Sequence, residues 1–345
     1  MKENQLSRYG AIAKVLQELG PTGKVFFAVS NADSGGPYAE FINEFPVDRD
    51  GVSRVYSTIQ GAIDACTGGR GDVVLVLPRL MAAGATDPTS WAETLIIAAS
   101  QSNVSLVGIP INRTQGGLPQ VKKGSGSTAL LTIRAPGCLI KNLGFNGIDA
   151  TGGGILLDDD ASTKSAFGTT IENCHFKNCQ GSAAATTGGA IMWSAAGGAW
   201  QVRIKDCIFY KNRAGIVMKG TSGSIPQDVV IENCDFTSNV NTTVDADIYV
   251  AADGIIGLVI KNCNFATVDV PAYATSPDAA RYIKLGAGTK GAIFGCRFAC
   301  VSDTAGTEYT FGVAGTAAII PTTVRIAGCF GEITAAPTQQ VIHRT

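Results

Sequence analysis

Three consecutive aspartates, Asp158, Asp159 and Asp160, come closest in this sequence to a catalytic or metal-binding group. A pair of carboxyl groups can cleave a glycosidic bond by acid and base catalysis, and clustered carboxylates are ligands that Ca²⁺ prefers. A basic run, Arg-Ile-Lys at 203–205, follows further along the chain. Its isoleucine belongs to a repeated core pattern, so the run needs no functional explanation. We therefore favour a solvated acidic turn, with a hydrolase and a structural Ca²⁺ site as open alternatives.

Histidine and cysteine offer a second kind of chemistry, because both can bind zinc and cysteine can form disulfides. The chain has 2 His and 10 Cys but no Cys-x-x-Cys pair, which disfavours a zinc site. His175 falls at an outward position of an expected strand, so we predict a surface histidine, and His343 lies in the C-terminal tail. No Ser-His-Asp arrangement, Walker loop or Gly-x-Gly-x-x-Gly motif occurs. The sequence therefore predicts no catalytic residue, no metal ligand and no cofactor.

A repeated pattern runs through the second half of the chain and decides the fold class. Its clear copies read Ile-x-Asn-Cys-x-Phe or Ile-x-Asp-Cys-x-Phe, with Cys at positions 174, 207, 234 and 263. Later copies place Gly before Cys296 and Cys329, and an earlier copy has Leu143 at the cysteine position. The copies recur every 27 to 33 residues, and a period of this length indicates a solenoid, propeller or array.

The alternation inside each copy selects among these architectures. Ile, Cys and Phe alternate with polar residues, which is the period of a strand, and a propeller blade would need about 40 residues. We predict an all-β, single-stranded right-handed parallel β-helix over residues 51–335, in which like side chains stack on like in successive rungs. Asn before the cysteine should form a bend, because it tolerates a left-handed backbone and its amide can bond the next rung.

The state of the cysteines follows from the same stacking. Six of them share one phase of the repeat, so their side chains point the same way, which is poor geometry for a disulfide. A buried free cysteine behaves as a small apolar side chain. We therefore predict reduced core thiols. Two pairs that are close in sequence, Cys174 with Cys179 and Cys296 with Cys300, remain the candidates for disulfides.

A cap at the N-terminal end is expected, because the open first rung of a β-helix would pair with other strands. Residues 57–67 fit such a cap helix. Ser57 can serve as the N-cap with Gln60 three residues later, which is a capping box, and the glycines at 68–69 would end the helix. An apolar stripe of this segment would cover the end of the rod: Ile59, Ala62, Ile63 and Cys66.

The N-terminal region, residues 1–50, is predicted to be an attachment arm, and residues 336–345 a polar tail. Residues 3–19 fit an amphipathic helix that Gly-Pro at 20–21 ends. A lone helix of this length is marginal in water, so its apolar side needs a partner. That partner is either the chain's own β-helix or, the alternative we favour, another subunit or a capsid shell. The residues predicted to bind it are Leu6, Tyr9, Ile12, Val15, Leu16 and Leu19.

Charge and composition exclude several kinds of partner. The formal net charge of -1 at pH 7 argues against electrostatic capture of nucleic acid or an anionic membrane. The sequence lacks the apolar run of about 7–15 residues that a signal peptide carries, and the apolar stretch of ~18 residues that a membrane span needs. Aromatic residues make up only 7%, which is few for surfaces that stack sugars. We therefore expect no nucleic-acid partner and no membrane.

Several stretches resemble the pectin-lyase-like β-helix superfamily, which includes pectinases, pectin methylesterases and phage tailspikes. They read RVYSTIQGAIDAC, GDVVLVLP, AETLIIA and NVSLVGI. The resemblance covers residues 54–335 and implies the fold rather than an activity. The preceding stretch, GKVFFAVSNADSGGPYAEFINEFPVDRDGVSRVYSTI, resembles the leader of β-helix proteins among bacteriophage virion structural proteins. It implies a capsid decoration protein or spike, commonly trimeric.

Two functions of different classes follow. The one we favour is a non-enzymatic bacteriophage virion structural protein, either a capsid decoration (cement) protein or a head spike. Its partners would be its own copies in a homotrimer and the major capsid protein or another virion protein, on a virion assembled in the host cytoplasm. The alternative is a tailspike-like β-helix that binds or cleaves surface glycans. Against cleavage, the Gly-His-Gly and Asn-Thr-Asp motifs of polygalacturonases are missing around Asp158–Asp160.

Overall fold

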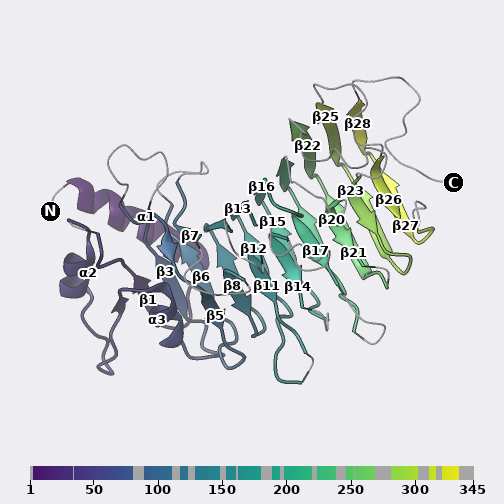
Figure 1. The fold of residues 1–345 in the computed structure, drawn as a ribbon. Helices are drawn as coiled ribbons and strands as arrows, with labels where there is room; N and C mark the ends of the chain where they lie inside the picture. Colours follow the sequence, from purple (N-terminus) through teal and green to yellow (C-terminus); the bar gives the residue numbers. More distant parts are fainter. Residues whose placement is uncertain are drawn as a thin grey trace.

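The chain forms an elongated coil of short strands in the computed structural model, and its helices gather at the N-terminal end (Figure 1). Among the described residues, no helix combines the length and the apolar character that a membrane crossing requires. The structure describes residues 3–33, 35–80, 89–110, 117–122, 129–147, 153–160, 162–179, 189–194, 198–219, 224–237, 246–251, 253–268, 281–301, 311–315 and 321–333.

Three parallel sheets form the walls of the coil, and the chain visits sheets A, B and C in turn within each rung. Sheet A contains, in order along the rod, β2 (Val55–Tyr56), β1 (Val25–Ala28), β3 (Val73–Val76), β6 (Ser105–Gly108), β9 (Leu139–Lys141), β12 (Thr170–Glu172), β15 (Arg203–Lys205), β18 (Val230–Glu232), β21 (Ile256–Lys261), β24 (Lys290–Phe294) and β27 (Val324–Ala327). Sheet B contains β4 (Trp91–Ala92), β7 (Gln120–Lys122), β10 (Gly144–Asn146), β13 (His175–Lys177), β16 (Ile208–Tyr210), β19 (Asp235–Thr237), β22 (Asn264–Val268), β25 (Arg297–Val301) and β28 (Phe330–Ile333). Sheet C contains β5 (Leu95–Ile97), β8 (Leu131–Ile133), β11 (Ile155–Leu157), β14 (Ile191–Trp193), β17 (Ile216–Met218), β20 (Ala246–Val250), β23 (Arg281–Leu285) and β26 (Phe311–Gly315). The predicted right-handed parallel β-helix is confirmed.

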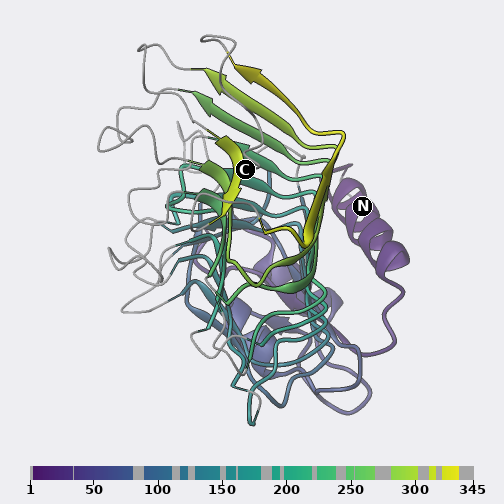
Figure 2. The same cartoon turned by 90° about the vertical axis from the view of Figure 1, so that its right-hand side faces the viewer.

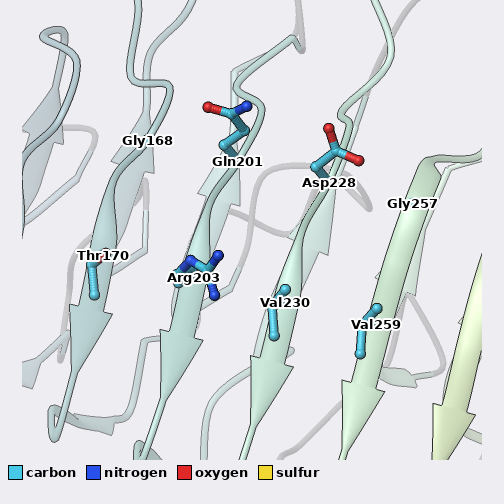
Figure 3. Close-up of a pocket in the computed structure, with 8 residues that line it drawn as sticks. All are labelled: Gly168, Thr170, Gln201, Arg203, Asp228, Val230, Gly257 and Val259. Atoms are coloured by element: carbon cyan, nitrogen blue, oxygen red, sulfur yellow. The ribbon is translucent and has the colours of Figure 1, made fainter.

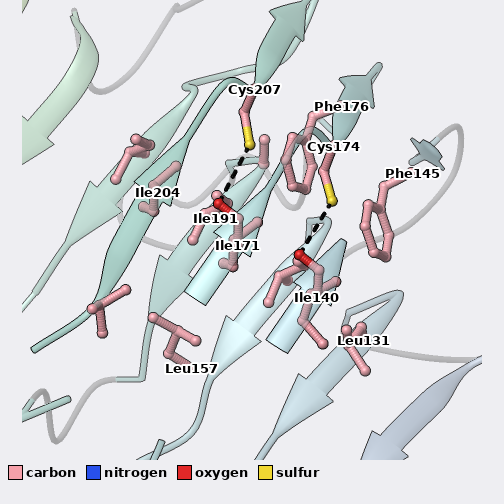
Figure 4. Packing of buried hydrophobic residues seen from close by; sticks show 14 of the residues in the cluster. Leu131, Ile140, Phe145, Leu157, Ile171, Cys174, Phe176, Ile191, Ile204 and Cys207 are labelled. Carbon is pink, nitrogen blue, oxygen red and sulfur yellow. Dashed lines mark hydrogen bonds between the residues drawn. The ribbon is translucent and has the colours of Figure 1, made fainter. Parts of the chain in front are cut away.

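Like side chains stack on like inside the coil, as the repeat predicts (Figure 4). In sheet A, Ile171 pairs with Ile204, which pairs with Ile231 in the next rung. In sheet B the phenylalanine rings are nearly parallel, with centroids 4.6–5.1 Å apart. This phenylalanine column consists of Phe145, Phe176, Phe209, Phe236, Phe265 and Phe298.

The cysteines of the repeat are free thiols in the same core. The Cys207 thiol lies 3.7 Å from the carbonyl oxygen of Ile171, and a corresponding contact recurs from rung to rung (Figure 4). Burial raises the pKa of the Cys207 thiol well above its ordinary value. Cys174 and Cys179 are both free, so the predicted reduced thiols are confirmed there. The side chain of Cys300 lies outside the described residues.

From β9 and β10 onward, one residue makes the bend between sheets A and B in each repeat. Asn142, Asn173, Asn233 and Asn262 hold it with positive φ angles of 49–58°, and Asp206 does so at 55°. The Asn173 side chain donates a hydrogen bond to the side-chain oxygen of Asn142 at 2.7 Å. In the last two repeats glycine takes the position, also at positive φ. The predicted role of the asparagine is therefore confirmed.

The cap helix α3 (Ile59–Asp64) closes the N-terminal end of the coil, and its predicted apolar stripe is buried there. Its N-cap is Thr58 rather than the predicted Ser57, because the Thr58 hydroxyl accepts the Gly61 N–H. The predicted capping box is therefore wrong. The backbone N–H groups of Ile59 and Gln60 have no partner within the helix and donate instead to the Glu93 carboxylate at 2.9 Å. The helix dipole favours a negative charge at this end of the helix.

The N-terminal helix α1 (Glu3–Leu19) has the predicted bounds and lies outside the coil, along one wall (Figure 2). Ile12 and Val15 are buried in a hydrophobic cluster with outward-facing residues of β1, β3 and β6. The short helix α2 (Tyr38–Glu44) adds Phe41 to this cluster. Strands β1, β3 and β6 carry apolar side chains on their outer side: Phe27, Val73, Leu75 and Val107. The helices shield this surface from water, which the more polar outer side of the later rungs does not require.

Candidate functional site

The acidic run at 158–160 is used by the chain itself. Asp158 forms ion pairs with Arg134 at 2.9 Å and with Lys164 at 3.2 Å. Asp160 accepts the backbone N–H groups of residues 162, 163 and 164 at 2.9–3.1 Å, and these bonds hold its pKa well below the ordinary value. The carboxylate oxygens thus fix a turn after β11. This agrees with the favoured acidic turn, although Asp158 is paired rather than simply solvated.

Asp159 has a different environment, since only 5% of its surface is exposed. Its backbone N–H donates to the Ser194 hydroxyl at 3.2 Å, and that hydroxyl donates to the Asp159 carbonyl oxygen at 2.9 Å. The three carboxylates therefore face different surroundings and do not converge. Within the described residues no group of three or more metal-ligating side chains converges either.

His175 is buried, with 3% of its surface exposed, so the predicted surface position is wrong. It begins β13 in sheet B, where its neighbours in the adjacent rungs are Gly144 and Ile208. Its strand phase does point outward, as the alternation indicates. Strand phase alone does not report what lies over the outer side of a sheet, which is why the exposure could not be read from the sequence.

The outer face of sheet A carries a column of alternating charges. Glu172 pairs with Lys141 and with Lys205, each at 3.0 Å, and Glu232 pairs with Lys261. Burial alone would raise the pKa of Glu172, but the two ammonium groups outweigh it and hold the pKa below its ordinary value. Opposite charges side by side in neighbouring strands support the register, so this column serves the fold.

A groove of about 620 Å³ lies beside that column, on the outer face of the same sheet (Figure 3). Its residues come from four successive rungs, two from each. One row consists of Gly168, Gln201 and Asp228, which come from the turns before their strands, and Gly257, which lies near the start of β21. The other row comes from the strands themselves and consists of Thr170, Arg203, Val230 and Val259.

The charges of the neighbouring column pair with one another, whereas the polar side chains of the groove have no such partners among the described residues. Gln201, Arg203 and Asp228 are exposed, and within the described part of the chain their side chains make no hydrogen bond or ion pair. A carboxylate, a guanidinium and an amide are thus available on two neighbouring rungs of the same groove. Such a set can bind hydroxyl groups or a charged group of a ligand.

A partly exposed tryptophan directly precedes one residue of the groove lining in the chain. Trp200 directly precedes Gln201, is 45% exposed, and packs edge-on against Phe167 at a centroid distance of 5.8 Å. The other two tryptophans, Trp91 and Trp193, are buried. A tryptophan that is fixed by a neighbour yet half exposed presents an apolar face to a ligand.

The predicted partner-binding residues lie elsewhere, on α1. Ile12 and Val15 are buried against the chain's own β-helix, and Leu16 and Leu19 pack against the same cluster. In this conformation the chain itself covers them, as in the first of the two alternatives, and an external partner at these positions stays a prediction. The physical reason is the apolar outer side of β1, β3 and β6, which needs a cover. The side chains of Leu6 and Tyr9 lie outside the described residues.

The sequence did not reveal the groove, because the residue types at its positions differ from one rung to the next. Arg203 was noticed only as part of a basic run. The sequence does contain one indication of the groove: glycine at position 168 is replaced by Gln201 and Asp228 at the same place in the next two repeats. This change is less conspicuous than the recurring Ile-x-Asn-Cys-x-Phe pattern.

No protein-family model matches the chain, and no curated protein matches it. Among solved structures, an alginate lyase from Paenibacillus sp. str. FPU-7 is 17% identical, covering 79% of this chain and 92% of its own, with a TM-score of 0.45. A pectin methylesterase from Aspergillus niger is 11% identical over 83% and 85%, with a TM-score of 0.41. A pectin methylesterase mutant in complex with a hexasaccharide is 12% identical over 93% and 92%, with a TM-score of 0.44. All are distant, and the parallel β-helix fold of this chain rests on its own strand pairing.

Proposed function

We propose that this chain is a β-helix that binds a carbohydrate polymer, without cleaving it, in the groove on sheet A. The observation that carries the proposal is the set of unused polar side chains, Gln201, Arg203 and Asp228, beside the half-exposed Trp200. The sequence suggests, as its alternative function, a β-helix that binds or cleaves glycans. The present proposal keeps the binding and leaves out the cleavage.

The chemistry of the groove suits sugars. Hydroxyl groups both donate and accept, so they pair with a carboxylate, a guanidinium and an amide together. The apolar face of a sugar ring packs on an aromatic ring such as Trp200. The groove runs across four successive strands of the outer face of sheet A, which suits a chain-like ligand better than a small molecule that must be buried.

The number of acids in the groove argues against glycoside hydrolysis there. Glycoside hydrolysis uses two carboxyl groups that flank the scissile bond, at about 5–10 Å from each other. The described lining of the groove holds one carboxylate, Asp228. The acidic run at 158–160 is occupied by its own turn and ion pairs, so it offers no second group.

A polysaccharide panel tests the proposal. Purified wild-type protein is screened by affinity electrophoresis against neutral and charged polysaccharides, together with Trp200→Ala and Arg203→Ala. Arg325→Ala is the matched control, because Arg325 is an exposed arginine of the same strand row near the far end of sheet A. Retardation by at least one polysaccharide that both groove variants lose, and the control keeps, is the expected result.

The absence of cleavage is measured on the same polysaccharides. Reducing ends and the ultraviolet absorbance of unsaturated products should stay at the level of the buffer control over a day. Release of either product, abolished in Asp228→Asn, would replace the binding proposal with an enzymatic one. A panel with no retardation at all would remove the carbohydrate proposal.

A second candidate is the virion structural role, favoured by the resemblance of the leader, residues 23–59, to phage virion proteins. In that role the chain is a homotrimer on the surface of the virion, bound to the major capsid protein or another virion protein. Light scattering of the full chain should give the trimer mass, and binding to empty capsids should be lost on deletion of residues 1–50. A monomer that ignores capsids would eliminate this candidate and leave the groove untouched.

A further inference from the structure

The cysteines that share one phase of the repeat form a continuous column inside the β-helix: Cys174, Cys207, Cys234, Cys263, Cys296 and Cys329. The thiols of neighbouring rungs point the same way, as those of Cys174 and Cys207 do in Figure 4. At the end of the column, the neighbouring Cys296 thiol and burial together raise the pKa of the Cys329 thiol. Thiol therefore lies next to thiol from rung to rung.

The spacing of this column matches a particular kind of metal chemistry. Neighbouring parallel strands lie about 4.7–4.9 Å apart, so the stacked sulfurs repeat at roughly this distance. A thiolate sulfur binds a d¹⁰ ion such as Zn²⁺ at about 2.3 Å, and two such bonds in a straight line span about 4.6 Å. Thiolates are soft ligands that favour soft ions. A soft ion that takes two ligands in line therefore fits between two sulfurs while the rungs keep their spacing.

Among the cysteines of the column, the last is the accessible one. Cys296 and the cysteines before it are buried, whereas Cys329 is half-buried. Cys329 lies at the bend between β27 and β28, and within the described part of the chain these two strands are the last of their sheets. An ion can therefore enter at the C-terminal end of the rod, beside Cys329, with Cys296 one rung below.

We propose that the thiols of Cys296 and Cys329 form a binding site for one soft d¹⁰ cation held by two sulfurs in line, the chemistry shared by Hg²⁺, Ag⁺ and Cu⁺. Two S–H bonds break, two metal–sulfur bonds form, and both protons pass to the solvent. With a divalent ion the product is neutral, which suits the apolar surroundings. Such an ion needs two ligands, and the described residues bring no three metal-ligating side chains together.

This site is independent of the groove on sheet A, and Hg²⁺ is the probe that tests it. The reduced full chain is loaded with Hg²⁺ and dialysed against an excess of glutathione, which removes ions held by a single thiol. Wild type should retain one ion per chain. Cys296→Ser and Cys329→Ser should each bind it about a hundredfold more weakly, because one of two prepositioned ligands is lost. Cys138→Ser is the matched control, since Cys138 is a buried thiol outside the column, and should retain the ion.

Two further readouts distinguish a bridged ion from an ion on one thiol. Binding between two thiols should release two protons per Hg²⁺, whereas a single thiol releases one. X-ray absorption at the mercury edge should show two sulfur ligands and no others. Methylmercury has one free coordination position, so without glutathione it should bind wild type and Cys296→Ser equally. Equal binding of methylmercury also shows that Cys329 stays accessible and the rod stays folded in Cys296→Ser.

Several outcomes would overturn the site. These are the loss of all Hg²⁺ from wild type to glutathione, the release of one proton per ion, and retention of the ion in Cys329→Ser. Cys300→Ser guards against a different pair, because Cys300 is close to Cys296 in the sequence. An ion lost in Cys300→Ser but kept in Cys296→Ser would overturn the assignment as well. If Cys296→Ser fails to fold by circular dichroism, Cys329→Ser decides, because its side chain is half-buried at the end of the rod.

Discussion

Asn173 donates its side-chain N–H to the side-chain oxygen of Asn142 in the adjacent rung at 2.7 Å, and both residues hold a left-handed backbone. One residue type thus meets two requirements of the bend between sheets A and B. It tolerates the positive φ angle that most side chains resist, and its amide satisfies the amide next to it. Between these two rungs, side chains therefore connect the bends directly.

Replacing Asn173 separates these two contributions. Asn173→Gly keeps the left-handed backbone and loses the amide bond, and should lower the free energy of unfolding by about 1 kcal/mol. Asn173→Ala loses both and should cost about 1 kcal/mol more. Urea unfolding followed by circular dichroism measures both values. If Asn173→Ala were as stable as Asn173→Gly, or more stable, the result would contradict a strained backbone at this bend.

The phenylalanine column should respond strongly to truncation in its middle. Phe209 is fully buried and stacks on Phe176 at 5.1 Å and on Phe236 at 4.6 Å. Phe209→Ala should cost about 3–5 kcal/mol, since it leaves a cavity against both neighbours. Phe209→Leu should cost less, because it refills part of the volume. The urea midpoints of the two variants test this order, and similar midpoints would mean that the coil closes around the gap.

Asp72 should make stability depend on pH. It is fully buried and accepts the N–H groups of Lys24 at 2.7 Å and Thr67 at 2.8 Å, besides its ion pair with Arg70. Burial alone would raise the pKa of Asp72, but Arg70 and these N–H groups hold it below its ordinary value of 3.8. A lowered folded-state pKa contributes stability that is present above the unfolded value and lost as the pH falls through the folded value.

Asp72→Asn tests that dependence. At pH 7 it should lower the free energy of unfolding by about 2–4 kcal/mol. The difference from wild type should stay constant down to about pH 5 and shrink below about pH 4, where the unfolded carboxyl becomes protonated. Asp228→Asn is the control, an exposed carboxylate, and should change little at any pH. If the difference in the free energy of unfolding between Asp72→Asn and wild type did not change with pH, the shape of the side chain rather than its charge would matter there.

The docking of α1 is open to a direct test. Ile12 is 5% exposed, and the neighbouring Ala13 is on the exposed side of the same helix. Ile12→Asp would bury a charge, so α1 should detach, and trypsin should cleave after Lys14 at least about tenfold faster than in wild type, because docking loses about 2–4 kcal/mol. Ala13→Asp should keep the wild-type rate. Equal cleavage in both variants would mean that α1 is not held by this contact.

The sequence predicts the core of this molecule because the core is a repetition. Ile, Cys and Phe recur in phase, so their stacking, the bend and the free thiols all follow from one pattern. The bounds of α1 also follow, since an apolar side and a terminating Gly20 are local properties. What α1 covers is not local, because the apolar outer side of β3 and β6 becomes visible only when the sheet is assembled.

The groove, by contrast, could not be predicted from the repeat. Gln201, Asp228 and Trp200 come from neighbouring rungs and break the repeat rather than follow it. A pattern search rewards recurrence, so it passes over single residues that meet only in space. The acidic run at 158–160 is the opposite case, because three adjacent carboxylates are conspicuous in the sequence, yet Asp158 and Asp160 serve ion pairs and a turn of the chain itself, in line with the favoured acidic turn.

The single-residue bend between sheets A and B has a consequence for how this chain can change. From β9 and β10 to β27 and β28, each strand of sheet A is followed by its partner in sheet B after the same two residues. All variation in repeat length falls in the other two corners. One residue inserted at the constant corner would turn Cys and Phe of that rung outward, whereas an insertion at the other corners lengthens a loop. Evolution and protein engineers alike therefore have two corners to vary, and the groove on sheet A begins at one of them.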